Sequence, residues 1–343
     1  MRKKPWKACI RTITIFFCIF FCFLSSCKKT NSKQPQVVLY CSVDQNIAEP
    51  IIAHFEKQYN IKVLARYDTE ATKTVGLVQR LRAEASATMA DIFWSSEVFH
   101  TIRLAEEGLF APYHSDQTVD WPRNFSHPKG FWYGFALRGR VIAYHTDRVP
   151  TAEAPRSLED LLDKKWRGRI VMANPKFGTT GGDVASWFVH YGPDRARSIL
   201  RQLKNNEIRI VDGNSTAVKM VHTGQADICL TDTDDVYAAQ RNGWPIAMNF
   251  LDQNNKGPLA IPNTASLLKG APHPQAARVL MDFLLSEQLE QLLARSDSHN
   301  APIHPNLAEE FQQYLIKHPL EIDYEKVAQQ LPTAKKTAGE ILP

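Results

Sequence analysis

Three carboxylates fall within four consecutive residues of this chain, at Asp232, Asp234 and Asp235. So dense an acidic group is too costly to bury without a compensating charge. Carboxylate oxygens bind hard cations or a ligand amine, and they also pair with guanidinium groups. Arg138 and Arg140 stand two residues apart in a segment typical of a strand, so they share one face and need an anion or carboxylates between them. A solvated turn is the alternative interpretation of the acidic segment.

Two segments rich in glycine and small polar residues are suited to binding an anion. Residues 174–182 and 212–216 each follow a predicted strand and open a predicted helix, so their backbone N–H groups lie beside the positive end of a helix. The first segment lacks the Lys-Ser/Thr ending of a nucleotide-binding P-loop, so ATP is not indicated. Plain helix capping is the alternative. The predicted anion contacts are Thr179, Thr180, Asn214 and Ser215.

Polar loops also follow the first three predicted strands. Because open α/β sheets bind ligands at the carboxyl ends of their strands, these loops are expected to face one binding site. Taken singly, each loop is also explained as a helix N-cap. The loops are residues 42–46, 67–73 and 95–97, and their acidic residues are Asp44, Glu70 and Glu97.

The elements that would position these residues form two α/β halves. Residues 37–107 alternate short apolar strands with amphipathic helices, and residues 157–251 repeat the alternation, beginning with a helix at 157–165. The long strand-like run at 131–144 is expected to cross between the halves. Residues 274–294 are predicted to form one long helix, and the proline-rich tail is expected to wrap the surface. The sequence therefore predicts an α/β protein with two lobes, each a mixed, mostly parallel sheet flanked by helices, with hinge strands between them and a ligand in the cleft.

The start of the chain has the pattern of an export signal. Five Lys/Arg residues precede an apolar run at residues 13–24, and Leu-Ser-Ser then leads to Cys27. The run is shorter than the roughly 20 residues of a membrane-spanning helix. Its ending resembles the lipidation site of bacterial lipoproteins. The predicted division is residues 1–26 as signal peptide, 27–36 as lipidated tether, 37–132 plus about 247–295 as first lobe, and 133–246 plus about 296–343 as second lobe.

Charge and cysteine content exclude several classes of protein. The formal charge of +5 comes from the leader, which holds five basic residues and no acid, so the chain from Cys27 onward is near neutral. Such a balance does not fit nucleic-acid binding. Cys41 and Cys229 are predicted to be buried thiols in strands, with a disulfide as the alternative. The sequence carries neither zinc-ligand spacing nor the nucleophile signature of a hydrolase, so an enzyme is not predicted.

From about Val37 to Pro302 the chain resembles the periplasmic substrate-binding proteins of ferric-iron ABC transporters. No single matching stretch is specific for this family, but the stretches taken together are. They are Val-Leu-Tyr-Cys-Ser-Val-Asp-Gln (38–45), Phe-Trp-Ser-Ser-Glu (93–97), Arg-Gly-Arg-Val (138–141), Lys-Trp-Arg-Gly-Arg-Ile (165–170), Asn-Pro-Lys-Phe-Gly-Thr-Thr (174–180), Gly-Asn-Ser (213–215) and Leu-Thr-Asp-Thr-Asp-Asp (230–235).

The resemblance implies a protein that closes two hinged lobes on ferric ion and a synergistic anion, then delivers the ion to a membrane permease and its ATPase. It implies that the residues of the two anion segments contact the anion, together with Arg138, which matches an arginine that some members use for carbonate. The chain departs from the family at two places. Asp44 stands where iron-binding relatives carry a histidine, and Asp234 and Asp235 stand where they carry adjacent tyrosines.

These departures leave the ligand open between two classes. Carboxylates suit hard cations, so the first expectation is ferric ion or another hard cation, with phosphate or carbonate as anion. The alternative is a small organophosphate or phosphonate held without metal, and a secreted hydrolase is the least favoured. A monomeric lipoprotein of the periplasm or cell surface is expected, with no cofactor of its own. The predicted oxygen ligands are Asp44, Glu70, Asp234 and Asp235, and Arg138, Arg140 and Glu97 join the anion contacts.

Overall fold

The computed structural model describes Met1 and residues 34–68, 74–252 and 256–342. The chain divides into Met1–Lys33 and the compact unit Gln34–Pro343, and this second unit has its own buried apolar cores. The predicted signal peptide apart from Met1, the predicted lipidation site Cys27 and the predicted ligand Glu70 lie outside the described residues. Within the described ranges, no helix combines the length and the apolar character needed to cross a membrane.

The first part of the sheet has the strand order β2-β1-β3-β10-β5. β1 pairs in parallel with β2 and β3, while β10 runs antiparallel to β3 and β5, and the short β4 pairs with β10. Parallel strands inside such a sheet are apolar on both faces, and β1 and β3 are accordingly buried along most of their length. The strands are β1 (Gln36–Cys41), β2 (Lys62–Tyr67), β3 (Ile92–Ser95), β4 (Phe110–Ala111), β5 (Tyr133–His145) and β10 (Ala260–Leu268).

The second part of the sheet continues from β5 in the order β5-β8-β6-β7. β6 pairs in parallel with β7 and β8, and both β8 and β9 run antiparallel to β5. The prediction of a mixed sheet is therefore confirmed, but the sheet is not mostly parallel, because four strand pairings in the described part of the chain are parallel and five are antiparallel. The further strands are β6 (Ile170–Ala173), β7 (Arg209–Val211), β8 (Ile228–Asp232) and β9 (Ile246–Phe250).

β5 belongs to both parts of the sheet. Its residues 133–139 pair with β10, whereas residues 140–145 pair with β8 and β9. The register with β10 shifts at Ala136, whose φ of 46° lies in the left-handed region that side chains disfavour. Side chains satisfy the displaced backbone, because Glu290 accepts from the Ala136 N–H at 2.6 Å and Asn263 donates to the Ala136 carbonyl at 2.7 Å. The bulge is therefore a specified feature of the crossing strand.

The sequence did not predict β10. Pro262 and Asn263 stand in its middle, and a proline argues against a central strand because it cannot donate to the ladder. In the structure, the register shift in β10 falls between Pro262 and Asn263, opposite the bulge of β5. The proline is tolerated where the ladder is already interrupted.

Helices α1, α8 and α9 cover one face of the first part of the sheet. Phe55 of α1 packs against Phe283 of α8, with ring centroids 5.3 Å apart. The single helix predicted at residues 274–294 is wrong, because Ser286 interrupts it and caps α9 by accepting from the Leu289 N–H at 3.2 Å. The helices of this part are α1 (Gln45–Tyr59), α2 (Val75–Ala83), α3 (Phe99–Glu106), α8 (Pro274–Leu284) and α9 (Glu287–Arg295).

The helix predicted at residues 157–165 is also wrong. Two short 3₁₀ turns stand there, because Asp160 accepts from the Arg156 N–H at 2.8 Å and Asp163 accepts from the Lys165 N–H at 2.9 Å. Such local bonds compete with a continuous helix. The turns are Asp160–Leu162 and Lys164–Trp166, and the helices that follow are α4 (Gly178–His190), α5 (Pro193–Asn205), α6 (Asn214–His222), α7 (Thr233–Arg241) and α10 (Tyr324–Ile341).

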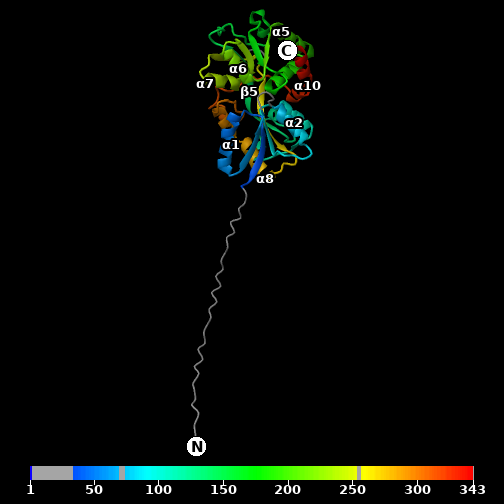
Figure 1. Cartoon of the computed structure of the whole chain (residues 1–343), viewed down its shortest axis with the longest axis vertical. Coiled ribbons are helices and arrows are strands. Elements are labelled where there is room, and N and C mark those ends of the chain that lie inside the picture. Colours follow the sequence, from blue (N-terminus) through cyan, green and yellow to red (C-terminus); the bar gives the residue numbers. More distant parts are fainter. Residues whose placement is uncertain (2–33, 69–73, 253–255, 343) are drawn as a thin grey trace. The chain divides into compact units, whose positions relative to one another are not determined.

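Figure 1 shows β5 between two groups of helices, with α1, α2 and α8 at one end of the compact unit and α5, α6, α7 and α10 at the other. This arrangement confirms the α/β fold with helices flanking both parts of the sheet. After β9 pairs with β5 in the second part, the chain returns to the first part at β10. The residue boundaries given above for the two lobes stay a prediction.

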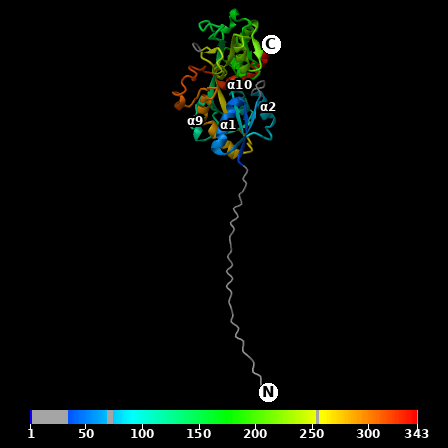
Figure 2. The ribbon, with the colours of Figure 1, turned by 60° about the vertical axis from the view of Figure 1, so that its left-hand side comes forward.

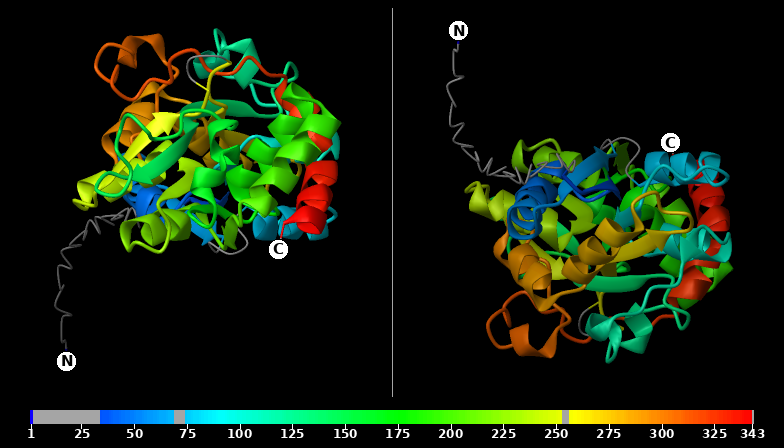
Figure 3. Two further views of the ribbon diagram at one scale, coloured as in Figure 1. Left: turned by 90° about the horizontal axis from the view of Figure 1, so that it is seen from above. Right: turned by 90° about the horizontal axis from the view of Figure 1, so that it is seen from below.

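The C-terminal helix α10 packs against elements of both groups. It contacts α4 and α5 on one side and α3 on the other. Figure 2 shows α10 at the level where the two groups meet, and Figure 3 shows it, in red, along the green and cyan helices. The sequence predicted a tail that wraps the surface and did not predict α10, because Pro332 lies inside it and proline disfavours a helix interior.

A charged cluster fixes α10 to the start of α3. The buried Glu97 accepts from the Phe99 N–H at 2.7 Å and lies 3.0 Å from His100 Nδ1. The other ring nitrogen of His100 lies 3.0 Å from Nζ of Lys335 on α10. Burial lowers the pKa of Lys335 to about 8, although the Glu97 carboxylate acts in the opposite direction. The same burial lowers the pKa of His100, again against Glu97.

The two cysteines of the body lie in different parts of the sheet, Cys41 in β1 and Cys229 in β8. Both thiols are buried and free. Burial raises the pKa of each thiol well above its usual range, so both stay protonated at neutral pH. The prediction of two buried core thiols is confirmed, and the alternative disulfide is not formed.

Replacing Glu290 should weaken the fold through the bulge of β5. Glu290 accepts from three backbone N–H groups, those of Ala136, Ile303 and His304, at 2.6 to 3.1 Å. We expect Glu290→Ala to lower the free energy of unfolding by about 3 kcal/mol, because buried donors lose their acceptor. Urea denaturation measures this change. The exposed Glu309→Ala should stay within about 0.5 kcal/mol of wild type, and an equal loss in both variants would contradict the assignment.

The lowered pKa of Lys335 predicts a pH dependence of stability. Between the folded value of about 8 and the ordinary value of 10.5, the unfolded chain binds a proton on Lys335 that the folded chain has released. Stability should therefore rise from about pH 8 to about pH 9.5 in the wild type. Urea denaturation across this range should show a smaller rise in Lys335→Met than in the wild type. Lys336→Met, a change at an exposed neighbour, should keep the full rise, and identical slopes in all three proteins would contradict the prediction.

Candidate ligand-binding site

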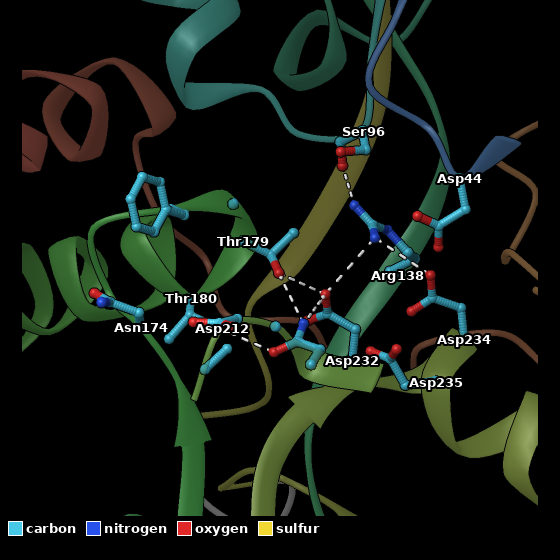
Figure 4. A pocket seen from close by; sticks show the side chains of 15 residues that line it. Asp44, Ser96, Arg138, Asn174, Thr179, Thr180, Asp212, Asp232, Asp234 and Asp235 are labelled. Carbon is cyan, nitrogen blue, oxygen red and sulfur yellow. Dashed lines mark hydrogen bonds and ion pairs between the residues drawn. The ribbon is translucent and has the colours of Figure 1, made fainter. Parts of the chain in front are cut away.

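A pocket lies where the loops after β1 and β3 meet β5 and the first turns of α4, α6 and α7 (Figure 4). The space inside it that can hold water-sized molecules is about 30 Å³, so the side chains nearly fill it. Asp44 and Ser96 come from the loops of the first part of the sheet, and the remaining lining residues come from positions 138–235. Seven predicted site residues line it, namely Asp44, Arg138, Thr179, Thr180, Asn214, Asp234 and Asp235.

The two predicted anion segments do open helices that point at the pocket. Gly178, with φ of 51°, turns the chain into α4 and places Thr179 and Thr180 in the first turn. Asn214 begins α6, and its side chain bonds to both threonines, with Nδ2 3.2 Å from Thr179 Oγ1 and Oδ1 3.2 Å from Thr180 Oγ1. The segments are therefore joined to each other by side-chain hydrogen bonds.

Asp232, at the end of β8, is the acceptor on which these donors converge. Thr179 Oγ1 donates to Asp232 Oδ2 at 2.6 Å, and Asn214 Nδ2 donates to the same oxygen at 3.0 Å. Arg140 Nη1 donates to the other oxygen, Oδ1, at 2.7 Å. The side chain is fully buried. Burial would raise the pKa of Asp232, but Arg140 and Arg138 hold it below its ordinary value, so the group stays ionised.

Arg138 spans the pocket from β5. Its guanidinium donates to the Ser96 carbonyl and, at 3.3 Å, to Asp234 Oδ2, and it lies 3.7 Å from Asp232 Oδ2 (Figure 4). Burial opposes its charge, but the surrounding carboxylates, Asp234 first, raise the pKa of Arg138 above its ordinary value. The Arg138 guanidinium thus contacts both the loop after β3 and the start of α7.

Arg140, predicted to contact the ligand, lies beside the pocket and does not line it. Its Nε donates to Asp183 Oδ2 at 3.0 Å, and its Nη1 donates to Asp232 Oδ1 at 2.7 Å. Both side chains of the Arg140–Asp183 pair are buried. Pairing of the two arginines with carboxylates was one of the alternatives that the sequence left open. Through it, Arg140 fixes the position of Asp232 from behind.

Asp234 and Asp235 open α7, where acidic residues suit the positive helix end. Asp235 Oδ2 accepts from Thr231 Oγ1 at 2.9 Å. One carboxylate oxygen from each of Asp232, Asp234 and Asp235 lies within 4.8 Å of the other two. Oxygens this close can share one cation.

Asp44 is the N-cap residue of α1, yet its side chain makes no capping hydrogen bond to the helix. It faces the pocket near Arg138 and Asp234 (Figure 4). Ser215, predicted as an anion contact, lines a neighbouring open cavity of about 640 Å³ that Asp44, Asp234 and Asp235 also line. The four residues therefore border the space next to the pocket.

Glu97 does not line the pocket. It is fully buried in the cluster with His100 and Lys335 that holds α10 to α3. The helix-cap interpretation of its loop fits this position, because Glu97 accepts from the first N–H groups of α3. Glu70, the remaining predicted ligand, lies outside the described residues.

The sequence did not select Asp232 as a site residue, nor the lining residues Ser96, Asn174 and Asp212. Asp232 was noticed only as a member of the acidic segment. Its position as the last residue of a buried strand was the signal that separates it from Asp234 and Asp235, because such a side chain points at the carboxyl edge of the sheet.

The pocket offers oxygen ligands. Among the described residues that line it, histidine, cysteine, methionine and tyrosine are absent. Five carboxylates are present, those of Asp44, Asp212, Asp232, Asp234 and Asp235. Carboxylates, hydroxyls and amide oxygens favour hard cations over soft ones. The arrangement is therefore suited to a small, highly charged cation.

Comparisons with known proteins agree with the predicted resemblance. The chain is similar to iron uptake protein A1 of Synechocystis, with 27% identity over 78% of this chain and 76% of that protein. It is also similar to the Fe(3+)-binding periplasmic protein of Serratia marcescens, with 24% identity over 76% of this chain and 77% of that protein.

Solved structures share the fold over nearly their whole length. Iron-bound HitA from Pseudomonas aeruginosa matches with a TM-score of 0.76 and 24% identity, covering 89% of this chain and 99% of that one. The ferric binding protein from Campylobacter jejuni matches with a TM-score of 0.80 and 21% identity, with the same coverage. Residues 87–322 match the family model described as bacterial extracellular solute-binding protein. The chain therefore belongs to the bacterial extracellular solute-binding protein family.

Proposed function

We propose that this protein captures ferric ion, or another hard cation, in the pocket around Arg138 and Asp232 and delivers it to the permease and ATPase of an ABC importer. The observation that carries the proposal is the group of carboxylate oxygens of Asp232, Asp234 and Asp235 within 4.8 Å of one another. They lie at the pocket where the two parts of the fold meet. The relatives named above are iron proteins by name, which supports the same cargo.

In this proposal, aspartate carboxylates take the place of the adjacent tyrosines that the family resemblance leads one to expect as anionic ligands. Asp44, Asp234 and Asp235 supply hard oxygen donors, and Glu70 is a further candidate. Ferric ion is a hard acid that accepts carboxylate oxygen. The cation is cargo and not a resident cofactor, and the protein has no catalytic role in this scheme.

Closure of the fold on the cation follows from where the ligands stand. Asp44 and Ser96 belong to the loops of the first part of the sheet, whereas Thr179, Asn214 and Asp234 belong to the second. A ligand that contacts both sets favours the closed arrangement over an open one. The lobes predicted from the sequence, joined through β5 and β10, would move about these two strands.

The location of the protein is part of the proposal. A monomer exported by residues 1–26 and anchored by lipid at Cys27 would stay at the bacterial membrane, beside its permease. The predicted tether, residues 27–36, would connect the lipid to the folded unit, whose first strand β1 begins at Gln36.

Removal of the paired acids at the start of α7 should abolish cation binding. We expect residues 34–343 to melt at a higher temperature with ferric nitrilotriacetate, since a ligand at 100 times its dissociation constant adds about 2.7 kcal/mol. The double variant Asp234→Ala, Asp235→Ala should lose this shift. Asp194→Ala with Glu309→Ala removes the same number of acids from exposed positions and should keep it.

The same melting experiment distinguishes the cargo. Mn²⁺, Tb³⁺, glucose 6-phosphate and 2-aminoethylphosphonate are tested beside ferric ion. A shift with a phosphorylated solute alone would replace the cation by an organic anion as cargo. An undiminished ferric shift in the Asp234/Asp235 double variant would remove these residues from the site.

A further inference from the structure

We propose that Asp232 serves as a built-in anion of the binding site, so that the cation is held without carbonate, phosphate or another anion from solution. This inference rests on the proposed function. The sequence alone predicted an exogenous anion at Thr179, Asn214 and Arg138. In the structure, all three side chains are directed at one oxygen of the Asp232 carboxylate.

The environment of Asp232 is that of a bound anion. Oδ2 accepts from Thr179 Oγ1 at 2.6 Å and from Asn214 Nδ2 at 3.0 Å, with Arg138 Nη1 at 3.7 Å. These donors come from three separate elements, the starts of α4 and α6 and the middle of β5. Hydroxyl, amide and guanidinium donors of this kind are groups that proteins use to hold small anions. Here they hold a side chain.

Arg140 and Asp183 keep that carboxylate in place. Arg140 Nη1 donates to Asp232 Oδ1 at 2.7 Å, and Asp183 orients the same guanidinium through Nε at 3.0 Å. All three side chains are buried. An anion from solution would have to displace Asp232 from four polar partners and leave a buried carboxylate uncompensated, which is strongly unfavourable.

Asp232 also faces the cation. One of its oxygens lies within 4.8 Å of carboxylate oxygens of Asp234 and Asp235, so a cation between those two acids would meet a third oxygen. Five carboxylates, those of Asp44, Asp183, Asp232, Asp234 and Asp235, face the guanidiniums of Arg138 and Arg140. The formal excess of these groups is three negative charges, and Asp212, which also lines the pocket, adds a fourth, so a trivalent cation is balanced without a further anion.

The test uses Tb³⁺ luminescence, sensitised by the protein's aromatic residues, in a carbonate-free buffer without coordinating anions. Residues 34–343 are titrated with TbCl₃ alone and with bicarbonate or acetate added. The expected result is that wild-type affinity changes less than about twofold on adding either anion. An increase of about tenfold or more with an added anion would overturn the inference.

Two substitutions at Asp232 sharpen the result. Asp232→Ala removes the carboxylate and leaves space for a small anion, so its Tb³⁺ affinity should fall at least about tenfold and recover with acetate or bicarbonate. Asp232→Asn fills the space with a neutral group, so it should lose affinity without recovery. Asp194→Asn, an exposed change, should behave as wild type. If Asp232→Ala binds Tb³⁺ as tightly as wild type without an added anion, the inference is wrong.

The wild-type titration tests the role of Asp232 as a built-in anion even if the Asp232 variants do not fold. Failure of this inference is distinct from failure of the proposed function. Tight wild-type binding that requires an added anion would overturn only the role of Asp232. A wild type that binds neither Tb³⁺ nor ferric ion would overturn the proposed function, and this inference with it.

Discussion

The buried chain of charges from Asp183 through Arg140 to Asp232 is the interaction on which the site depends. A guanidinium buried between two carboxylates is stable only if its geometry is well matched, and here the distances are 3.0 and 2.7 Å. Arg140 lies on β5, Asp232 on β8 and Asp183 on α4. These three paired side chains therefore fix three elements of the second part of the fold relative to one another. Asp232 then fixes the starts of α4 and α6 through Thr179 and Asn214.

Two other features connect this fixed frame to the first part of the sheet. β5 continues through the bulge at Ala136 into its pairing with β10, and Glu290 and Asn263 satisfy the backbone there. α10 packs against α4 and α3 and is held to the latter by the cluster of Glu97, His100 and Lys335. These features connect the two parts of the sheet, and the pocket between them is lined from both sides.

The acids of the pocket differ in their surroundings. Asp232 is saturated with donors from its own part of the fold, whereas Asp44 and Asp234 face the pocket near Arg138 (Figure 4). This difference separates a structural anion from the carboxylates proposed to take up the cation. A family of solute-binding proteins that shares one fold can change its cargo through such a division of roles, because the scaffold stays while the pocket residues vary.

The sequence by itself determined the α/β class, the strands and helices with clear periodicity, the family, and seven of the fifteen residues that line the pocket. Thr179, Thr180 and Asn214 were recognisable because glycine and small polar residues at a helix start expose backbone donors. It did not reveal β10, which contains Pro262, or α10, which contains Pro332, because proline argues locally against both elements. Only the tertiary structure decided the partners of the charged residues. Glu97 and Asp232 both follow a strand in the sequence, but long-range packing places Glu97 against α10 and Asp232 among the anion donors. The sequence shows which side chains are charged, but the groups that compensate those charges come from distant segments that only folding brings together.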